Sequence, residues 1–211
     1  MNKTRVRDGR GRPRKSTLSA RKLPVQARSH ETVSVILEAA ARILESRGLP
    51  GFSTNAIAAR AGVSIGTLYQ YFPNKDTIVL ALISSFEERL DHAVLTAVRA
   101  GKGQPLRPCL RLFVRALVNE HYRRPRLNRV LEAEEERLGS PGNHTDFSKL
   151  VLELLRDHAG EVAIPVSATT ERVVMAVLRA VVDLGVASGA SPRSTEHRAM
   201  RAVCGYLLYT G

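Results

Sequence analysis

The stretch AGVSIGTLYQYFPNK, residues 61–75, decides the fold of this 211-residue chain. Gly62 ends one short helical segment, because glycine readily adopts the left-handed conformation in which helices stop. Ser64 begins a second segment, since its side chain can accept a hydrogen bond from the first helical turn, and Pro73 closes that segment. Two helices joined by so short a turn must cross steeply. This pattern is typical of a helix-turn-helix.

The residues before this stretch predict two further helices. Ser53 caps TNAIAARA, residues 54–61, which is the first helix of the pair. Upstream, apolar residues recur at three- and four-residue spacing from about Ser29 to Arg47, and Gly48 follows. Residues 28–75 are therefore expected to form a three-helix domain that contains the helix-turn-helix.

The remainder of the chain also has helical periodicity, and strand-like alternation is scarce. Glycine and proline residues separate the apolar segments and mark the turns. The expected helices cover residues 75–99, 106–122, 126–138, 145–158, 168–188 and 193–209. The sequence therefore predicts an all-α protein of about nine helices, in which residues 76–211 form a second, larger helical domain.

The helix that begins at Ser64 has an apolar and a polar side. Val63, Leu68 and Phe72 are the natural anchors to the other helices. The residues left nearer the exposed side suit a DNA major groove, because glutamine pairs with adenine and threonine can contact a base or a phosphate. Tyrosine hydroxyls reach phosphate oxygens, although Tyr69 and Tyr71 could instead pack in an interhelical core. The exposed side comprises Ile65, Gly66, Thr67, Tyr69, Gln70 and Tyr71.

Positive charge is concentrated at the N-terminus. Residues 1–30 hold ten Lys or Arg side chains and one Asp, so they supply nine of the twelve excess positive charges. A basic arm on a near-neutral body favours an anionic partner, although a merely solvated tail is the alternative. A lipid surface is disfavoured because the arm has no apolar face to insert, and Pro13 and Pro24 interrupt it. Nucleic acid is the favoured partner.

The run of residues 36–78, and most specifically AGVSIGTLYQYFPNK, resembles the DNA-binding domain of tetracycline-repressor-type (TetR) bacterial transcriptional regulators. The resemblance covers about a quarter of the chain. It implies that Thr54 binds a phosphate, that Asn55 lies near a base edge, and that Lys75 holds a backbone phosphate. It also implies that a group of residues lies in or along the major groove, comprising Ser64, Ile65, Gly66, Thr67, Tyr69, Gln70 and Tyr71.

Within the basic arm, residues 1–27, the sequence RGRP resembles an AT-hook. In that motif an extended Arg-Gly-Arg-Pro lies in a narrow minor groove, which A·T tracts make attractive to arginine. Arg10 and Arg12 are the candidate minor-groove residues. Sequence-independent attraction to phosphates remains the alternative for both.

Residues 76–211 carry 18 basic and 16 acidic side chains, so this domain has no electrostatic reason to bind DNA. The resemblance implies a homodimer formed through the last two helices, about 168–209, and a ligand pocket among the preceding helices. Both of those helices have apolar residues on more than one side, as expected of helices covered twice. Candidate pocket residues, any of which could instead fill the core, are Phe86, Leu90, Phe113, Leu117, Tyr122, Leu131, Phe147, Leu154 and Leu178.

Several other features carry little functional signal. The acidic run at residues 132–136 could receive a cationic ligand, but such runs are more often solvated. The histidines lack metal-ligand spacing, Cys109 and Cys204 are far apart, and no nucleophile is paired with a base, so we expect no metal, cofactor or enzymatic activity. No secretory signal or membrane span is evident, which predicts a cytoplasmic protein.

Together these patterns predict a dimeric regulator that binds a palindromic operator in double-stranded DNA. It is expected to be a repressor relieved by a small apolar ligand in the larger domain, with no role for a membrane. The alternative is a nucleoid-associated or architectural DNA-binding protein on the same scaffold, without an inducer.

Overall fold

The computed structural model describes residues 25–139 and 145–209. Within those ranges the chain is entirely helical, with nine α-helices, two single-turn 3₁₀ helices and no strand, which confirms the expected fold class. Arg10 and Arg12 lie outside the described residues. No described helix combines the length and apolar character needed to span a membrane. The α-helices are α1 Val25–Arg47, α2 Thr54–Ala61, α3 Ile65–Tyr71, α4 Lys75–Gly101, α5 Leu106–Arg123, α6 Pro125–Leu138, α7 Thr145–Asp157, α8 Ala168–Ala187 and α9 Pro192–Leu208.

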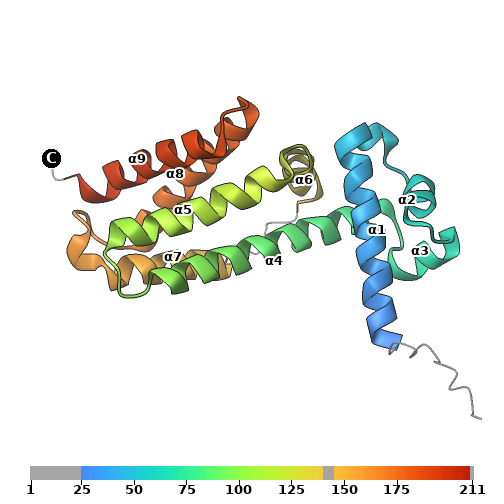
Figure 1. The fold of residues 1–211 in the computed structure, drawn as a ribbon, viewed down its shortest axis with the longest axis horizontal. Coiled ribbons are helices and arrows are strands. Elements are labelled where there is room, and N and C mark those ends of the chain that lie inside the picture. The colour runs from blue at the N-terminus through green and yellow to red at the C-terminus, as the bar shows by residue number, and fades with distance from the viewer. Residues whose placement is uncertain (1–24, 140–144, 210–211) are drawn as a thin grey trace, which may run out of the picture.

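Helices α1, α2 and α3 form a small lobe at one end of the molecule (Figure 1). Ser53 and Ser64 cap α2 and α3 as expected, since each side chain accepts a hydrogen bond from a backbone N–H in the first turn. Gly62 closes α2 with φ +69°, a conformation that other residues adopt only with strain. Ile36, Ile57 and Leu68 are fully buried at the centre of this lobe, where the three helices meet.

The larger lobe contains most of α4 together with α5 and α7–α9. Helices α4 and α5 pack along each other, and α8 and α9 form a second pair that packs against α5. A continuous apolar core fills the space between these helices, with Phe113 and Leu178 fully buried within it. Gly185 allows α8 to approach α9 closely, because a Cβ at this position would clash with Thr195 and lie 2.9 Å from the Tyr122 hydroxyl.

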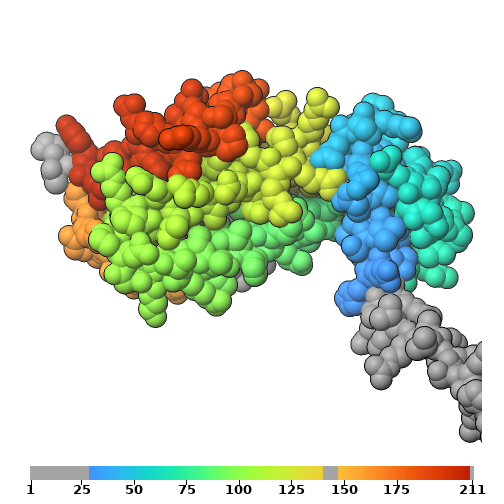
Figure 2. Space-filling model, in the orientation of Figure 1, coloured from blue at the N-terminus to red at the C-terminus, as the bar shows by residue number. Residues whose placement is uncertain are grey.

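Two helices belong to both lobes. The first turns of α4 place Ile78, Val79 and Leu82 in the core of the small lobe, whereas its later turns contribute to the core of the larger one. Helix α6 likewise buries Leu127 and Leu131 in the small-lobe core. Figure 2 shows the α1–α3 lobe joined to the rest of the molecule by atoms of these regions, in green and yellow. The small-lobe core therefore draws residues from both sides of the expected division at residue 75.

Helix α1 begins earlier than the sequence pattern predicts. The structure places its first residue at Val25, whereas the periodicity placed the start at about Ser29 and assigned residues 1–27 to the arm. The periodic pattern reports only the apolar face that packs on the domain. Helix geometry continues upstream of that face because residues 25–28 contain no glycine or proline.

Candidate functional site

Helix α3 has the two-sided character that groove binding requires. Leu68 is fully buried and Phe72 nearly so, and both anchor the helix to the small-lobe core. On the opposite side, Tyr69 keeps 50% of its surface exposed and Ile65 keeps 40%. Gln70 is also exposed. The helix thus presents an uncharged polar and apolar surface to solvent at the end of the molecule farthest from α9 (Figure 1).

The small hydroxyl side chains at this surface are held in place by local hydrogen bonds. The Ser64 Oγ accepts a hydrogen bond from the Thr67 backbone N–H at 3.0 Å, and the two hydroxyl oxygens are 2.8 Å apart. Thr54 begins α2, and its Oγ1 lies 3.2 Å from the Tyr69 hydroxyl. These pairs bring the expected phosphate ligand of α2 next to the exposed tyrosine of α3, so the two helices share one surface.

The remaining expected DNA contacts differ in exposure. Asn55, Gly66 and Lys75 are exposed, and Lys75 lies in the first turn of α4, which Asn74 caps. Tyr71 is an exception, because it is half-buried and packs against the small-lobe core. Its expected place on the open side of α3 is therefore only partly correct. The helical repeat turns Tyr71 toward the small-lobe core, on the side of Leu68, whereas it turns Tyr69 and Gln70 toward solvent.

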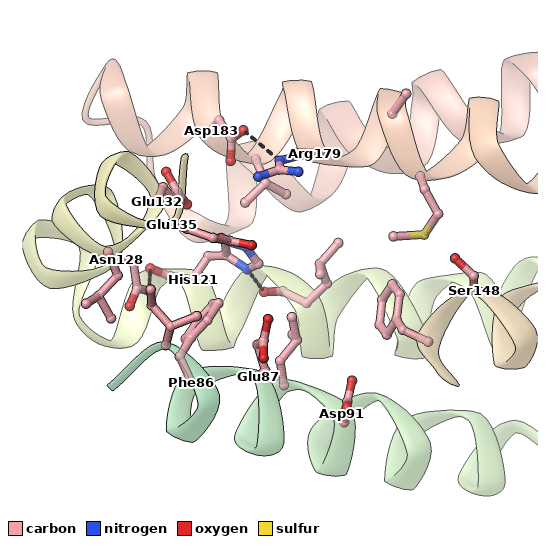
Figure 3. Close-up of a pocket in the computed structure, with 18 of the residues that line it drawn as sticks. Phe86, Glu87, Asp91, His121, Asn128, Glu132, Glu135, Ser148, Arg179 and Asp183 are labelled. Carbon is pink, nitrogen blue, oxygen red and sulfur yellow. Dashed lines mark hydrogen bonds and ion pairs between the residues drawn. The ribbon is translucent and has the colours of Figure 1, made fainter. Parts of the chain in front are cut away.

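A cavity of about 390 Å³ lies in the larger lobe between α4, α5, α6, α7 and α8 (Figure 3). This volume is in the range of small-molecule sites in proteins. Five of the candidate pocket residues line it, namely Phe86, Leu90, Leu117, Leu131 and Phe147.

Four other candidates do not line the cavity. Phe113, Leu154 and Leu178 are buried in the continuous apolar core, and Phe113 stacks at a tilt on Phe147 with ring centroids 5.6 Å apart. Tyr122 packs at the edge of that core, and its hydroxyl lies 2.7 Å from Thr195 Oγ1. These side chains share the same helical periodicity as the lining residues. Periodicity alone cannot distinguish a side chain that faces a void from one that is packed on all sides.

The cavity is far more acidic than the sequence analysis anticipated. Its lining includes two arginines, both exposed, alongside six carboxylates from α4, α6 and α8. The only signal that could have revealed this was the acidic run, because Glu132 and Glu135 from that run face the cavity (Figure 3). The six carboxylates are those of Glu87, Asp91, Glu132, Glu135, Glu171 and Asp183.

Three titratable groups meet at one end of the cavity. His121, Glu132 and Asp183 each place a potential ligand atom within 4.8 Å of the others. Burial, and then the nearby Asp183 charge, raises the pKa of Glu132 to about 6. Burial also raises the pKa of Asp183 and lowers the pKa of His121. Because the Arg179 guanidinium lies 4.0 Å from Asp183, a fixed positive charge already occupies the neighbourhood and opposes a metal ion there.

The His121 ring has a defined orientation. Its Nδ1 lies 2.8 Å from the Leu117 carbonyl oxygen, which can only accept, so Nδ1 carries the proton and donates. When the ring is neutral, Nε2 is therefore an acceptor. The ring also packs edge-on against Phe86, with centroids 5.3 Å apart. Lowering of the His121 pKa by burial favours this neutral form.

Glu171, in the first turn of α8, is the most unusual residue of the lining. Its side chain is buried, with 4% of the residue surface exposed, and its Oε1 has no hydrogen-bond partner among the described residues. Buried carboxylates are normally paired or hydrogen-bonded, because removing an unpaired charge from water is strongly unfavourable. Glu171 is therefore a buried acidic residue of the cavity lining, and no described residue supplies a partner for its Oε1.

Ion pairs connect the cavity walls to the small lobe. Arg124, at the start of α6, donates to both carboxylate oxygens of Glu45 on α1 at 2.8 and 2.6 Å and to Glu38 at 2.8 Å. At the other end of α6, Arg137 donates to Asp76 on α4 at 2.9 Å. Helix α6 also supplies Asn128, Leu131, Glu132 and Glu135 to the cavity lining. One helix therefore lines the cavity and contacts the small lobe.

Two family models match the chain. Residues 36–82 match bacterial regulatory proteins of the tetR family, and residues 105–207 match the tetracyclin repressor-like C-terminal domain. Among curated proteins, the HTH-type transcriptional regulator TtgR of Pseudomonas putida is 34% identical over 104 residues, which is 49% of each chain. The regulator EthR of Mycolicibacterium smegmatis is 35% identical over 74 residues, 35% of this chain and 34% of its own. The aligned part thus spans about half or less of these relatives.

Solved structures share the fold over most of the chain. The fatty acid degradation regulator FadR from Bacillus halodurans superposes with a TM-score of 0.73 at 19% identity, covering 85% of this chain and 97% of its own. The TetR-like regulator LfrR from Mycobacterium smegmatis, solved in complex with proflavine, superposes with a TM-score of 0.62 at 20% identity, covering 86% and 99%. At these identities the likeness establishes the architecture.

Proposed function

This chain belongs to the TetR family of bacterial transcriptional regulators, which are DNA-binding proteins and not enzymes, and from this premise we propose that it is a dimeric repressor released by a small ligand. The observation that carries the proposal is the pairing of an outward-facing α3 with a cavity that shares α6 with the small lobe. An architectural protein without an inducer would have no use for such a cavity.

In this function the exposed side of α3 enters the major groove of DNA. Gln70 and Tyr69 are the central residues, because both extend into solvent from the helix that Leu68 anchors. Thr54 and Lys75 flank them as phosphate ligands from the first turns of α2 and α4. The remaining contacts are assigned to Asn55, Ser64, Ile65, Gly66, Thr67 and the exposed part of Tyr71, with Arg10 and Arg12 in the arm.

The proposed dimer forms through α8 and α9. Leu184 on α8 is 65% exposed and Tyr209, just after α9, is 73% exposed, although both are large apolar residues. Val177, Val181 and Tyr206 are half-buried on the same two helices. A two-fold pairing there would cover these side chains and place two copies of α3 about one DNA turn apart, as a palindromic operator requires.

Release by the ligand follows from the shared helices. A ligand that moves α6 acts directly on α1 through Arg124 and on the start of α4 through Arg137. Because only three residues separate the end of α3 from the start of α4, such a shift changes the spacing of the two reading helices in the dimer. The ligand must bind the DNA-incompatible arrangement more tightly, since a ligand with equal affinity for both states changes nothing.

The test begins with selection of binding sites from random double-stranded DNA, followed by fluorescence anisotropy on the selected operator. Gln70→Ala should weaken operator binding by about tenfold or more, the effect of losing one bidentate base contact. Asn119→Ala, a matched loss of an exposed amide on α5, should leave affinity unchanged. Both variants should elute as dimers in size-exclusion chromatography. Operator binding by Gln70→Ala within about twofold of wild type would refute the assignment of α3 to the groove.

A further inference from the structure

Resting on the proposed function, we infer that the cavity selects an organic cation: a small molecule with an apolar aromatic body and one positively charged nitrogen group that binds Glu171. The sequence predicts an apolar ligand. The apolar walls of the cavity suit such a ligand only for its aromatic body. The charge of the ligand is set by the polar part of the lining.

Glu171 is the buried acidic residue of the cavity lining. Its carboxylate lies in the cavity wall with 4% of the residue exposed, and Oε1 has no hydrogen-bond partner among the residues that the structure describes. A positively charged nitrogen group in the cavity beside this carboxylate would supply the missing counter-charge. Opposite charges attract strongly where water is largely excluded, and this attraction does not require an N–H donor.

The other charged residues of the cavity lining are also mainly acidic. Five further carboxylates line the cavity, four of them half-buried and Asp91 exposed, whereas its two arginines are both exposed. Arg179 lies 4.0 Å from Asp183, and the Arg172 guanidinium donates to the Thr169 hydroxyl at 3.5 Å. The buried fixed charge is therefore negative, and the positive groups are at the solvent side. An anionic ligand would be repelled, and a neutral one would leave Glu171 unpaired.

The dimensions and apolar walls of the cavity suit a flat aromatic molecule. The lining residues of α8 run from Glu171 to Asp183, which corresponds to about 18 Å along the helix axis at the usual rise per residue. Phe86, Leu90, Leu117 and Phe147 provide apolar walls from α4, α5 and α7. A flat body of one or two aromatic rings fits both these walls and the volume of about 390 Å³. The His121–Glu132–Asp183 group lies twelve residues along α8 from Glu171 and adds negative charge at the other end.

The test uses three compounds of nearly identical shape in isothermal titration calorimetry with the full-length protein. They are N-methyl-phenylpyridinium, which is a cation, neutral phenylpyridine and the biphenyl carboxylate anion. The wild-type protein should bind the cation about tenfold or more tightly than the neutral compound and should not bind the anion measurably. Glu171→Gln keeps the size of the side chain and should remove this preference while retaining affinity for the neutral compound. Glu153→Gln, an exposed position on α7 outside the lining, should behave as wild type.

Equal or tighter binding of the neutral compound or the anion, or failure of the cation to bind, would overturn the inference. So would a cation preference that survives in Glu171→Gln. A divalent metal ion is the competing candidate ligand of the carboxylate cluster and is titrated alone. Tight binding of the metal ion, with no binding of the pyridinium, would also overturn the inference. The proposed function is judged separately by operator binding and by its release with neutral or anionic compounds, so a cavity with another charge preference leaves the regulator assignment standing.

Discussion

Replacing Arg124 by methionine should weaken the attachment of α6 to the small lobe. The guanidinium makes two hydrogen bonds to Glu45 at 2.6 and 2.8 Å, and the Arg124 and Glu45 side chains are each only 27% exposed. The bonds to Glu45 and Glu38 raise the pKa of Arg124, so the charge persists under all ordinary conditions. Methionine retains most of the apolar stem, which isolates the loss of the charged contacts.

The expected magnitude follows from this geometry. Fully exposed ion pairs contribute about 0.2–1 kcal/mol, whereas hydrogen bonds to charged groups contribute about 1.5–3 kcal/mol when shielded from water. Because the pair is about three-quarters buried and bidentate, we expect a coupling energy between Arg124 and Glu45 of about 1–2 kcal/mol. A double-mutant cycle with Arg124→Met and Glu45→Gln, measured by urea unfolding, gives this quantity directly.

The bidentate pair of Arg115 with Glu196 provides the control. Its distances are 3.0 and 3.1 Å, but it joins α5 to α9 within the larger lobe and its arginine side chain is 53% exposed. It should show a smaller coupling energy, and Arg115→Met should not alter operator affinity, whereas Arg124→Met should alter it. A coupling energy for Arg124 and Glu45 below about 0.3 kcal/mol, or identical effects of the two arginine variants on DNA binding, would refute the role given to α6.

Two further predictions concern the larger lobe. Gly185→Ala should destabilise the protein by about 1–3 kcal/mol in urea unfolding, because the added Cβ would press on Thr195 and force α8 and α9 apart; a variant as stable as wild type would show that the two helices have room to separate. Glu132→Gln should raise stability at neutral pH by up to about 1 kcal/mol, allowing for the partial exposure of this side chain. The folded-state pKa of Glu132, about 6, lies above its ordinary 4.5, so the native state binds more protons between these values and the stability of wild type falls as pH rises through that window. The gain in Glu132→Gln should therefore disappear below about pH 4.5, and a gain that is independent of pH would contradict the assignment.

Helix α3 could be anticipated from local signals. Residues 61–75 contain a left-handed glycine, a capping serine and a terminating proline, and each of these acts within one or two turns of helix. Leu68 could be assigned to the core for the same reason, because the helical repeat sets it opposite Tyr69 and Gln70. Tyr71 could not be placed so well, since whether it packs inward depends on residues of the small-lobe core that are distant in sequence.

The cavity could not be anticipated in the same way. Phe86 and Phe113 both occupy apolar helical positions, yet one lines the cavity and the other is enclosed in the core, because their surroundings come from helices distant in sequence. Glu171 follows a capping serine, where an acidic residue normally favours the helix N-terminus, so nothing in its own segment marks it as a cavity residue. Its place in the cavity depends on neighbours from helices that are distant in sequence.

The shared helix α4 has a practical consequence for dissecting this protein. Its first turns are buried with α1–α3 through Ile78, Val79 and Leu82, and α6 covers the same core with Leu127 and Leu131. A fragment cut after residue 75 would expose an apolar patch on the small lobe, and even one ending at residue 101 would lack the cover that α6 provides. We therefore expect truncated DNA-binding fragments to aggregate or to unfold readily, so that binding measurements require the intact chain.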